Sequence, residues 1–439
     1  MKSRRNVELR LGLLAVGITG LGYVLVQLPE KSDIPADLWF FVTIFVGLYV
    51  LAHMAVLQFA PNADPSLLPL AAMLNGIGFV TISRLDPDLA RTQVGWMAAG
   101  MAAFFGTLVV VRRIRTLERY RYTFLLLGLL ALLLPLAPGI GKTINGARLW
   151  VGIGPINFQP GEAAKVLLVI FFAAYLVDKR ELLSSGSRRL GRLVLPSVKH
   201  LGPLLLAWAV SILVMVMQKD LGSSLLFFAV FGAMLYAATE RAAYLITALV
   251  LFVGGATIAH RLFDHVQDRV TTWLDPWPVA ADEGFQVVQS WFAFGTGGFS
   301  GTGLGRGNPQ LIPNAPTDFV FSAIGEELGL IGAVAVIAAI LMFVGSGFRI
   351  ALEAERPFPK LFAAGLTVIM GVQTFVIIGG VTRVIPLTGV TLPFISYGGS
   401  SLVANFVVLG LLLRISDDNA RARGLVRRRT SAPTGATPS

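Results

Sequence analysis

The sequence predicts an all-α fold, a polytopic transmembrane helical bundle of about twelve spans. Hydrophobic residues make up 55% of the 439 positions and charged residues only 14%, whereas soluble domains are about 25% charged. Apolar runs of roughly 17–25 residues recur along the chain, and a helix of that length crosses a membrane. Residues 1–416 are therefore expected to form one integral membrane domain.

The apolar runs place the spans in order. A large loop, residues 260–316, precedes the tenth span, and the tail, residues 417–439, is basic and then rich in Thr, Ser, Pro and Gly. Such a composition predicts disorder for the tail. The predicted spans are 11–28, 38–59, 67–82, 92–111, 122–136, 161–177, 201–217, 221–238, 242–259, 318–345, 361–380 and 391–413.

The positive charges predict the orientation. With the N-terminus inside, the inner segments hold 25 of the 36 Lys and Arg residues, the outer segments hold 10, and Lys165 lies in a span. Positive residues gather on the cytoplasmic side, so both termini are predicted to be cytoplasmic and loops 138–160 and 260–316 external. This pattern accounts for the net charge of +11 without a nucleic-acid partner. The chain has no cysteine and four scattered histidines, so a thiolate nucleophile is excluded and a histidine zinc site is not expected.

Three acidic residues stand at the start of the tenth predicted span. Asp318, Glu326 and Glu327 lie in the segment Pro313–Gly329, and ionisable residues at membrane depth are costly enough to mark functional sites. The simplest alternative for Asp318 is a helix cap. Glu326 lies about 12 Å further along a straight helix, which is too far for the paired carboxylates of a glycoside hydrolase.

A second charged pair lies at the start of the sixth predicted span. Glu162 and Lys165 are three residues apart and share one helix face. We expect them to neutralise each other at low dielectric. Pro160 and the helix dipole explain Glu162 as a helix start but leave Lys165 unexplained. Arg148, in the preceding loop, is either an interfacial anchor or a ligand contact.

The large loop and the last two predicted spans supply the remaining candidates. The glycine-rich stretch 295–307 does not fit a dinucleotide fingerprint, but its backbone could bind an anion; a flexible surface loop is the alternative. Around the last span, close packing explains the glycines more simply than catalysis does. The candidates in these segments are Gln286, Gln289, Ser290, Gly298, Gly303, Arg306, Gln373, Arg383, Ser396, Gly398, Gly399 and Ser400.

Together these motifs resemble the SEDS family of bacterial shape, elongation, division and sporulation proteins, to which RodA, FtsW and SpoVE belong. The matching segments are Asn-Gly-Ala-Arg-Leu-Trp (145–150), Gln-Pro-Gly-Glu-Ala-Ala-Lys (159–165), Gln-Lys-Asp-Leu-Gly (218–222), the glycine-rich loop, Thr-Asp-Phe-Val-Phe (317–321) with Gly-Glu-Glu-Leu-Gly (325–329), and Pro-Leu-Thr-Gly (386–389) with Pro-Phe-Ile-Ser-Tyr-Gly-Gly-Ser-Ser (393–401). The resemblance covers residues 140–416. Five preceding spans are typical of the twelve-span RodA-type proteins of actinobacteria.

The resemblance implies a peptidoglycan glycosyltransferase of the bacterial cytoplasmic (inner) membrane that polymerises lipid II at its outer face, with a class B penicillin-binding protein, a single-span transpeptidase, as partner. Asp318 matches the family's essential aspartate and would be the general base of an inverting transfer. Arg148, Arg269, Arg306 and Arg383 are candidates to stabilise the leaving pyrophosphate, with a divalent cation, Mg²⁺ or Mn²⁺, as a further candidate. The family resemblance favours a RodA-like role in cell elongation and shape.

Two departures from the family pattern and two rival functions remain. Gly161 stands where the family usually has Ser, and Arg383 adds a cation where many members are apolar. A flippase for the lipid-linked precursor would also show many spans and buried charges, although Asp318 lies at the rim and not at the midplane. A non-catalytic scaffold for the transpeptidase is the third reading.

Overall fold

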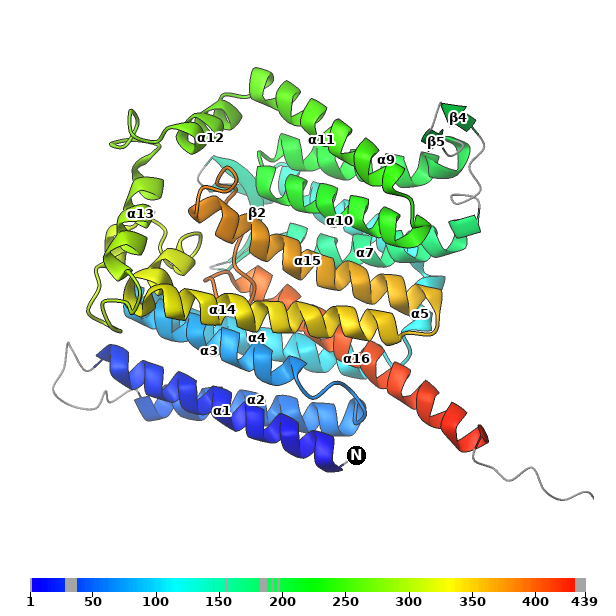
Figure 1. Cartoon of the computed structure of the whole chain (residues 1–439), viewed down its shortest axis with the longest axis horizontal. Helices are drawn as coiled ribbons and strands as arrows, with labels where there is room; N and C mark the ends of the chain where they lie inside the picture. Colours follow the sequence, from blue (N-terminus) through cyan, green and yellow to red (C-terminus); the bar gives the residue numbers. More distant parts are fainter. Residues whose placement is uncertain are drawn as a thin grey trace, which may run out of the picture.

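The computed structural model describes residues 2–27, 38–144, 146–154, 156–181, 188–190, 193–195 and 198–430. In this part of the chain ten helices are long and apolar enough to cross a membrane. Two shorter apolar helices, Arg121–Leu136 and Leu205–Met217, lie where the fifth and seventh spans are predicted. The long helices run side by side in one bundle (Figure 1). The prediction of an all-α polytopic membrane fold is confirmed.

The helices follow one another along the chain in two halves. The first half forms α1 (Lys2–Gln27), α2 (Leu38–Phe59), α3 (Leu67–Leu85), α4 (Pro87–Val110), α5 (Arg115–Arg119), α6 (Arg121–Leu133), the 3₁₀ turn η1 (Leu134–Leu136) and α7 (Pro160–Asp178). The second half forms α9 (Val198–Met217), α10 (Leu221–Thr239), α11 (Ala242–Leu262), α12 (Asp264–Leu274), α13 (Phe285–Gly297), η2 (Pro309–Leu311), α14 (Val320–Glu353), α15 (Pro357–Val381) and α16 (Gly399–Thr430).

Two small antiparallel sheets stand in the connections, which the sequence did not predict. β1 (Gly141–Ile144), β2 (Ala147–Ile153) and β3 (Ile156–Phe158) form one sheet in the order β1-β2-β3. β4 (Arg188–Leu190) pairs with β5 (Leu193–Leu195). The large loop 260–316 also has structure of its own, because it contains α12, α13 and η2.

The last helices differ from the predicted spans at their ends. α16 begins at Gly399 and not near residue 391, and it continues to Thr430, so the prediction of disorder from residue 417 is wrong as far as residue 430; residues 431–439 lie outside the described residues. α14 is interrupted at Gly329, which has φ +65° and ψ −165°. A Cβ there would lie 2.3 Å from the Gly301 nitrogen, so this break requires glycine.

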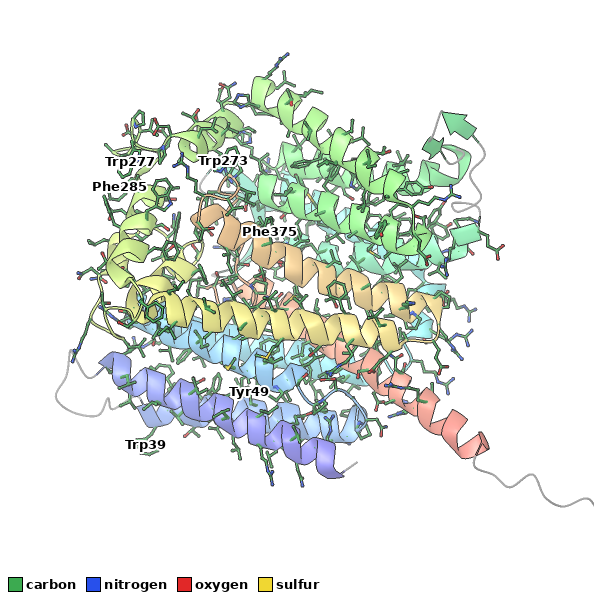
Figure 2. All side chains as sticks on the ribbon, in the orientation of Figure 1. Trp39, Tyr49, Trp273, Trp277, Phe285 and Phe375 are labelled. Carbon is green, nitrogen blue, oxygen red and sulfur yellow. The ribbon has the colours of Figure 1, made fainter. Side chains whose placement is uncertain are left out.

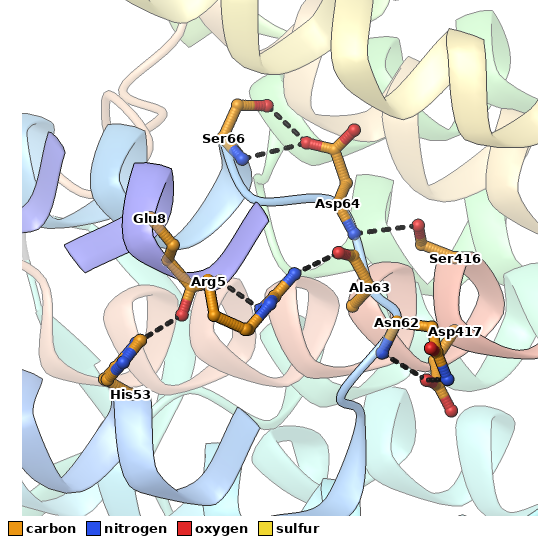
Figure 3. A network of polar contacts seen from close by, with 9 residues as sticks. All are labelled: Arg5, Glu8, His53, Asn62, Ala63, Asp64, Ser66, Ser416 and Asp417. Carbon is orange, nitrogen blue, oxygen red and sulfur yellow. Dashed lines mark hydrogen bonds and ion pairs between the residues drawn. The ribbon is translucent and has the colours of Figure 1, made fainter. Parts of the chain in front are cut away.

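A polar network attaches the first two helices to the rest of the bundle (Figure 3). Glu8 of α1 is almost fully buried and contacts both Arg5 and His53, whose Nδ1 lies 2.6 Å from the Glu8 carboxylate. Arg5 also donates to the Ala63 carbonyl ahead of α3. The same connection continues to α16, where the Asp64 amide donates to Ser416 Oγ at 3.0 Å.

The two ends of the bundle carry different structures. α12 and α13 lie at one end, called here the cavity end, whereas the start of α1, α5 and the end of α16 lie at the other (Figure 1). The segments predicted to be external and cytoplasmic are therefore separated in space. That the cavity end faces outwards stays a prediction from the distribution of Lys and Arg.

Candidate functional site

A cavity of about 520 Å³ opens at the cavity end of the bundle. Its wall is formed by α12, α13, the segment before α14 and the segment after α15. Among the predicted site residues, Asp318, Gln286 and Arg383 line it, and so does Arg269. The wall also carries the charged or titratable side chains of His265, Asp268, Asp282 and Glu283.

Asp318 stands in the segment immediately before α14. The helix begins at Val320 with Phe319 at the capping position, so the reading of Asp318 as a helix cap is wrong. Burial raises the pKa of Asp318 to about 6, although the nearby Arg269 and a hydrogen bond with Thr317 oppose the rise. A carboxyl with this pKa is mostly ionised at neutral pH, so it can accept a proton.

Arg269 brings a positive charge to this carboxylate. A Cβ at Gly389 would lie 3.7 Å from Oδ2 of Asp318 and 4.0 Å from Nη2 of Arg269, so the three residues meet at one point of the wall. Arg269 Nη1 donates to the Leu387 carbonyl at 2.9 Å. Burial lowers the pKa of Arg269, and Asp318 and Asp220 oppose the decrease.

Glu162 and Lys165 form the buried ion pair that the sequence predicts. Lys165 Nζ lies 2.8 Å from Glu162 Oε2, and their side chains are 5% and 7% exposed. Lys165 also donates to Gln373 Oε1 at 3.1 Å, and Gln373 donates to the Thr391 carbonyl at 2.8 Å. The pair therefore joins α7 to α15 and to the segment before α16, and it does not line the cavity.

Ser396 and Ser400 connect neighbouring segments without lining the cavity. Ser396 Oγ donates to the Thr317 carbonyl at 2.6 Å, next to Asp318. Ser400 Oγ accepts a hydrogen bond from the Gln159 amide at 2.8 Å, at the start of α7.

The two glycines beside them serve close packing. A Cβ at Gly399 would lie 2.0 Å from the Trp96 ring, and one at Gly398 would lie 3.0 Å from the Thr391 side chain. The interpretation that close packing explains these glycines agrees with the structure.

The glycine-rich loop is held against α14 by hydrogen bonds from its own amides. The amides of Thr302 and Gly303 donate to the carbonyls of Glu326 and Glu327 at 3.0 Å each. The amide of Asn308 donates to Glu326 Oε1 at 2.6 Å. Because these amides already have acceptors, the prediction of an anion-binding nest is wrong for them.

Arg84 of α3 completes the attachment of this loop. Its Nε lies 3.3 Å from Glu327 Oε1, and its Nη2 donates to the Gly307 carbonyl at 3.2 Å. Glu326 and Glu327 therefore hold this loop in place, and neither of them lines the cavity. Gly298 and Gly303 adopt positive φ angles of +52° and +96° in the same loop.

The remaining predicted residues lie away from the cavity. Arg148 belongs to β2, and its Nη2 donates to the Ala137 carbonyl at 3.0 Å. Ser290 is buried with its Oγ 2.6 Å from Ser322 Oγ. Gln289 on α13 is partly buried and Arg306 is exposed, both outside the cavity wall.

Asp220 is a buried charged residue that sequence reasoning missed, as it missed His265, Asp268, Asp282 and Glu283 on the cavity wall. It lies in the motif Gln-Lys-Asp-Leu-Gly, directly before α10, and its carboxylate accepts a hydrogen bond from the Ser223 amide at 2.9 Å. Burial raises its pKa, while Ser223 and Lys165 oppose the rise. The charge of Asp220 opposes the decrease in the pKa of Arg269, and the charge of Lys165 opposes the rise in the pKa of Asp220. Asp220 therefore interacts electrostatically with both the cavity wall and the buried pair.

Comparison with known sequences identifies relatives over nearly the whole chain. The proteins named peptidoglycan glycosyltransferase RodA from Mycobacterium tuberculosis and Mycobacterium leprae are 43% and 44% identical over 444 and 426 residues. These matches cover 99% and 95% of this chain and 94% and 91% of the relatives. A probable peptidoglycan glycosyltransferase FtsW of Geobacter metallireducens is 38% identical over 72% of this chain and 83% of its own length.

Solved structures share the fold. A chain from a peptidoglycan synthase complex that coordinates polymerization and crosslinking matches with a TM-score of 0.67 and 29% identity, over 81% of this chain and 98% of that chain. The rod shape determining protein RodA of Thermus thermophilus matches with a TM-score of 0.58 and 27% identity, over 81% and 97%. The model of the cell cycle protein family FtsW, RodA and SpoVE matches residues 70–421. This multi-pass membrane protein therefore belongs to the FtsW, RodA and SpoVE family.

Proposed function

We propose that this peptidoglycan glycosyltransferase uses Asp318 as the general base when it polymerises lipid II into glycan strands. The observation that carries the proposal is the position of Asp318 on the wall of the 520 Å³ cavity, beside Arg269, with its pKa raised to about 6. The Asp318 carboxylate takes the proton of the acceptor hydroxyl as that oxygen bonds to the anomeric carbon of the donor sugar. The bond from this carbon to the lipid pyrophosphate breaks on the opposite side, which inverts the configuration.

The leaving pyrophosphate needs positive charge nearby. Of the four arginines considered from the sequence, only Arg269 and Arg383 lie on the described cavity wall. Arg269 and Asp318 both approach Gly389 on this wall, so we assign Arg269 to the developing phosphate charge. Arg148 and Arg306 are not assigned to this role, since one donates within its own loop and the other is exposed away from the cavity.

We propose that the divalent cation predicted from the sequence binds together with the substrate. Among the described residues there is no group of three or more His, Asp or Glu side chains that could hold a metal. Mg²⁺ usually binds through one or two carboxylates together with substrate phosphates, so a cation would enter with the pyrophosphate. Chelation should then stop polymerisation, and added Mg²⁺ or Mn²⁺ should restore it; full activity in excess chelator would oppose this assignment.

Asp318→Asn tests the general base. Base catalysis contributes roughly 10²–10⁴-fold, and Asn keeps the size of the side chain. The variant should therefore fold and lose nearly all polymerisation of labelled lipid II in detergent. Asp88→Asn, at an exposed acid on α4 outside the cavity wall, is the matched control and should retain activity. An active Asp318→Asn protein would remove Asp318 from the chemistry.

The same assay separates the rival functions. A flippase or a non-catalytic scaffold would produce no polymer from lipid II in detergent, where there is no membrane to cross and no transpeptidase to recruit. The position of Asp318 and the cavity at one end of the bundle supports surface chemistry at the headgroups, whereas transporter sites lie near the midplane.

The partner and the orientation extend the proposal. One solved relative belongs to a peptidoglycan synthase complex, which supports a class B penicillin-binding protein, a single-span transpeptidase, as the partner of this chain. Both termini would be cytoplasmic, the cavity end would face outwards, and the RodA names of the relatives support a role in cell elongation and shape. A purified cognate pair should polymerise lipid II faster than this chain alone, by shifting the population of conformers; equal rates would oppose activation by the partner.

A further inference from the structure

Arg383 connects the end of α15 to α12 through reciprocal hydrogen bonds. Its Nε donates to the Trp273 carbonyl at 2.8 Å, and its Nη2 donates to the Leu274 carbonyl. In return, Trp273 Nε1 donates to the Arg383 carbonyl at 3.1 Å. Figure 2 shows Trp273 beside the junction of α12 and the end of α15. Two donor groups of this arginine are therefore committed to protein acceptors.

The guanidinium also packs on α13. The Arg383 Cζ lies 5.1 Å from the ring centre of Trp291, close enough for a cation–π contact. The backbone of Arg383 has φ +65°, in the left-handed region that side chains rarely adopt. Residues in such conformations persist where surrounding contacts hold them. Arg383 is thus held by contacts to α12 and α13, two helices of the cavity wall.

A second contact ties α12 to the same segment. Arg269 of α12 donates to the Leu387 carbonyl, four residues after Arg383. The segment 383–387 is therefore joined to α12 at both of its ends, once through Arg383 and once through Arg269. Any movement of α12 away from α15 would carry Arg269 away from Asp318.

We infer that Arg383 is a positioning residue that holds α12 so that Arg269 stays beside Asp318. We call the set Trp273, Leu274, Trp291 and Arg383 the α12 latch. This role rests on the proposed function for its effect on catalysis, but the latch itself is a property of the protein without substrate. It differs from the role in pyrophosphate binding that the sequence suggests for Arg383.

The choice of replacement separates the two roles. Lysine keeps the positive charge, but it lacks the planar fork that reaches two carbonyls and stacks on an indole ring. A cation that only neutralises pyrophosphate would be replaced well by lysine. A latch would be broken by Arg383→Lys nearly as much as by Arg383→Met, and also by Trp291→Leu, which leaves the arginine in place.

The activity test measures kcat and KM for lipid II with the purified full-length chain. Displacements of about 1 Å at a catalytic group can reduce rates about 100-fold, so we expect Arg383→Met and Arg383→Lys to lower kcat about 10- to 100-fold with little change in KM. Trp291→Leu should lower kcat in the same direction, and the double variant should be no worse than Arg383→Met. A fully active Arg383→Lys, a change confined to KM, or additive losses would overturn the inference.

Hydrogen exchange of the substrate-free protein tests the latch separately from the chemistry. In Arg383→Met and in Trp291→Leu, the amides of α12 should exchange faster, while those of α3 and α16 stay unchanged. Arg91→Met, at an exposed arginine on α4, is the matched control and should alter neither exchange nor activity. Unchanged α12 exchange in both latch variants would overturn the inference, whether or not polymerisation by the wild type is found.

Discussion

The buried pair of Glu162 and Lys165 allows a stability prediction with a magnitude. Both side chains are at most 7% exposed and their charged atoms are 2.8 Å apart. Removing one partner leaves a buried, uncompensated charge and costs on the order of 3–5 kcal/mol, a large part of a total stability of about 5–15 kcal/mol. Glu162→Ala and Lys165→Ala should therefore each be poorly folded or inactive.

The double variant should behave differently. It leaves no unpaired charge, but Gln373 Oε1 loses the Lys165 donor, which costs about 1–3 kcal/mol. The double change should therefore be no worse than either single change, which corresponds to an interaction energy of at least about 3 kcal/mol, the upper end for contacting residues.

Thermal unfolding in detergent, followed by circular dichroism, measures the cycle. Glu240→Ala is the control, because Glu240 pairs with Arg180 at 3.2 Å on the surface and exposed pairs contribute about 1 kcal/mol or less. Additive losses from the two single changes would refute the argument that Glu162 and Lys165 act as a unit.

Two further predictions follow from the cavity and from the orientation. The polymerisation rate should fall as the pH drops through about 6, because Asp318 becomes protonated. Since Arg269 lowers the pKa of Asp318, Arg269→Gln should move this decrease in rate to higher pH. A decrease at the same pH in the variant would show that Arg269 does not act on the base. The chain has no native cysteine, so Ser300→Cys should react with an impermeant thiol reagent in intact cells while Thr116→Cys should not, and the reverse pattern would contradict cytoplasmic termini.

The spans were predictable because apolar length alone decides which segments cross a membrane. The exception is the start of α16. Residues 391–398 are apolar enough to extend a span, but Phe394 has φ +63° and the helix starts only at Gly399. Hydropathy records which residues avoid water, and it does not record the backbone conformation they adopt. The short strands β1–β3 were missed for a related reason, because strands this short show no extended alternation of apolar and polar residues.

The site was predictable where its members are near in sequence. Glu162 and Lys165 share a helix face by spacing, and Asp318 stood out as an acid at the rim of a span. The closeness of Arg269 to Asp318 depends on how the fold brings α12 to the segment before α14, which no spacing encodes. Asp220 caps α10. Because a helix cap already explains an aspartate at this position, its electrostatic interaction with Arg269 could not be inferred from the sequence.

The attachment of α1 and α2 also has a consequence for how these helices keep their angular register. The family match begins at residue 70, so both helices precede the shared core. Lipid tails are as apolar as leucine, and hydrophobicity therefore gives two membrane helices little reason to prefer one rotation over another. The contact of Glu8 with His53 of α2, and that of Arg5 with the Ala63 carbonyl, are satisfied at one rotation of α1 against its neighbours. Buried polar contacts thus set the rotation of α1, as the shape of the core does in a water-soluble protein.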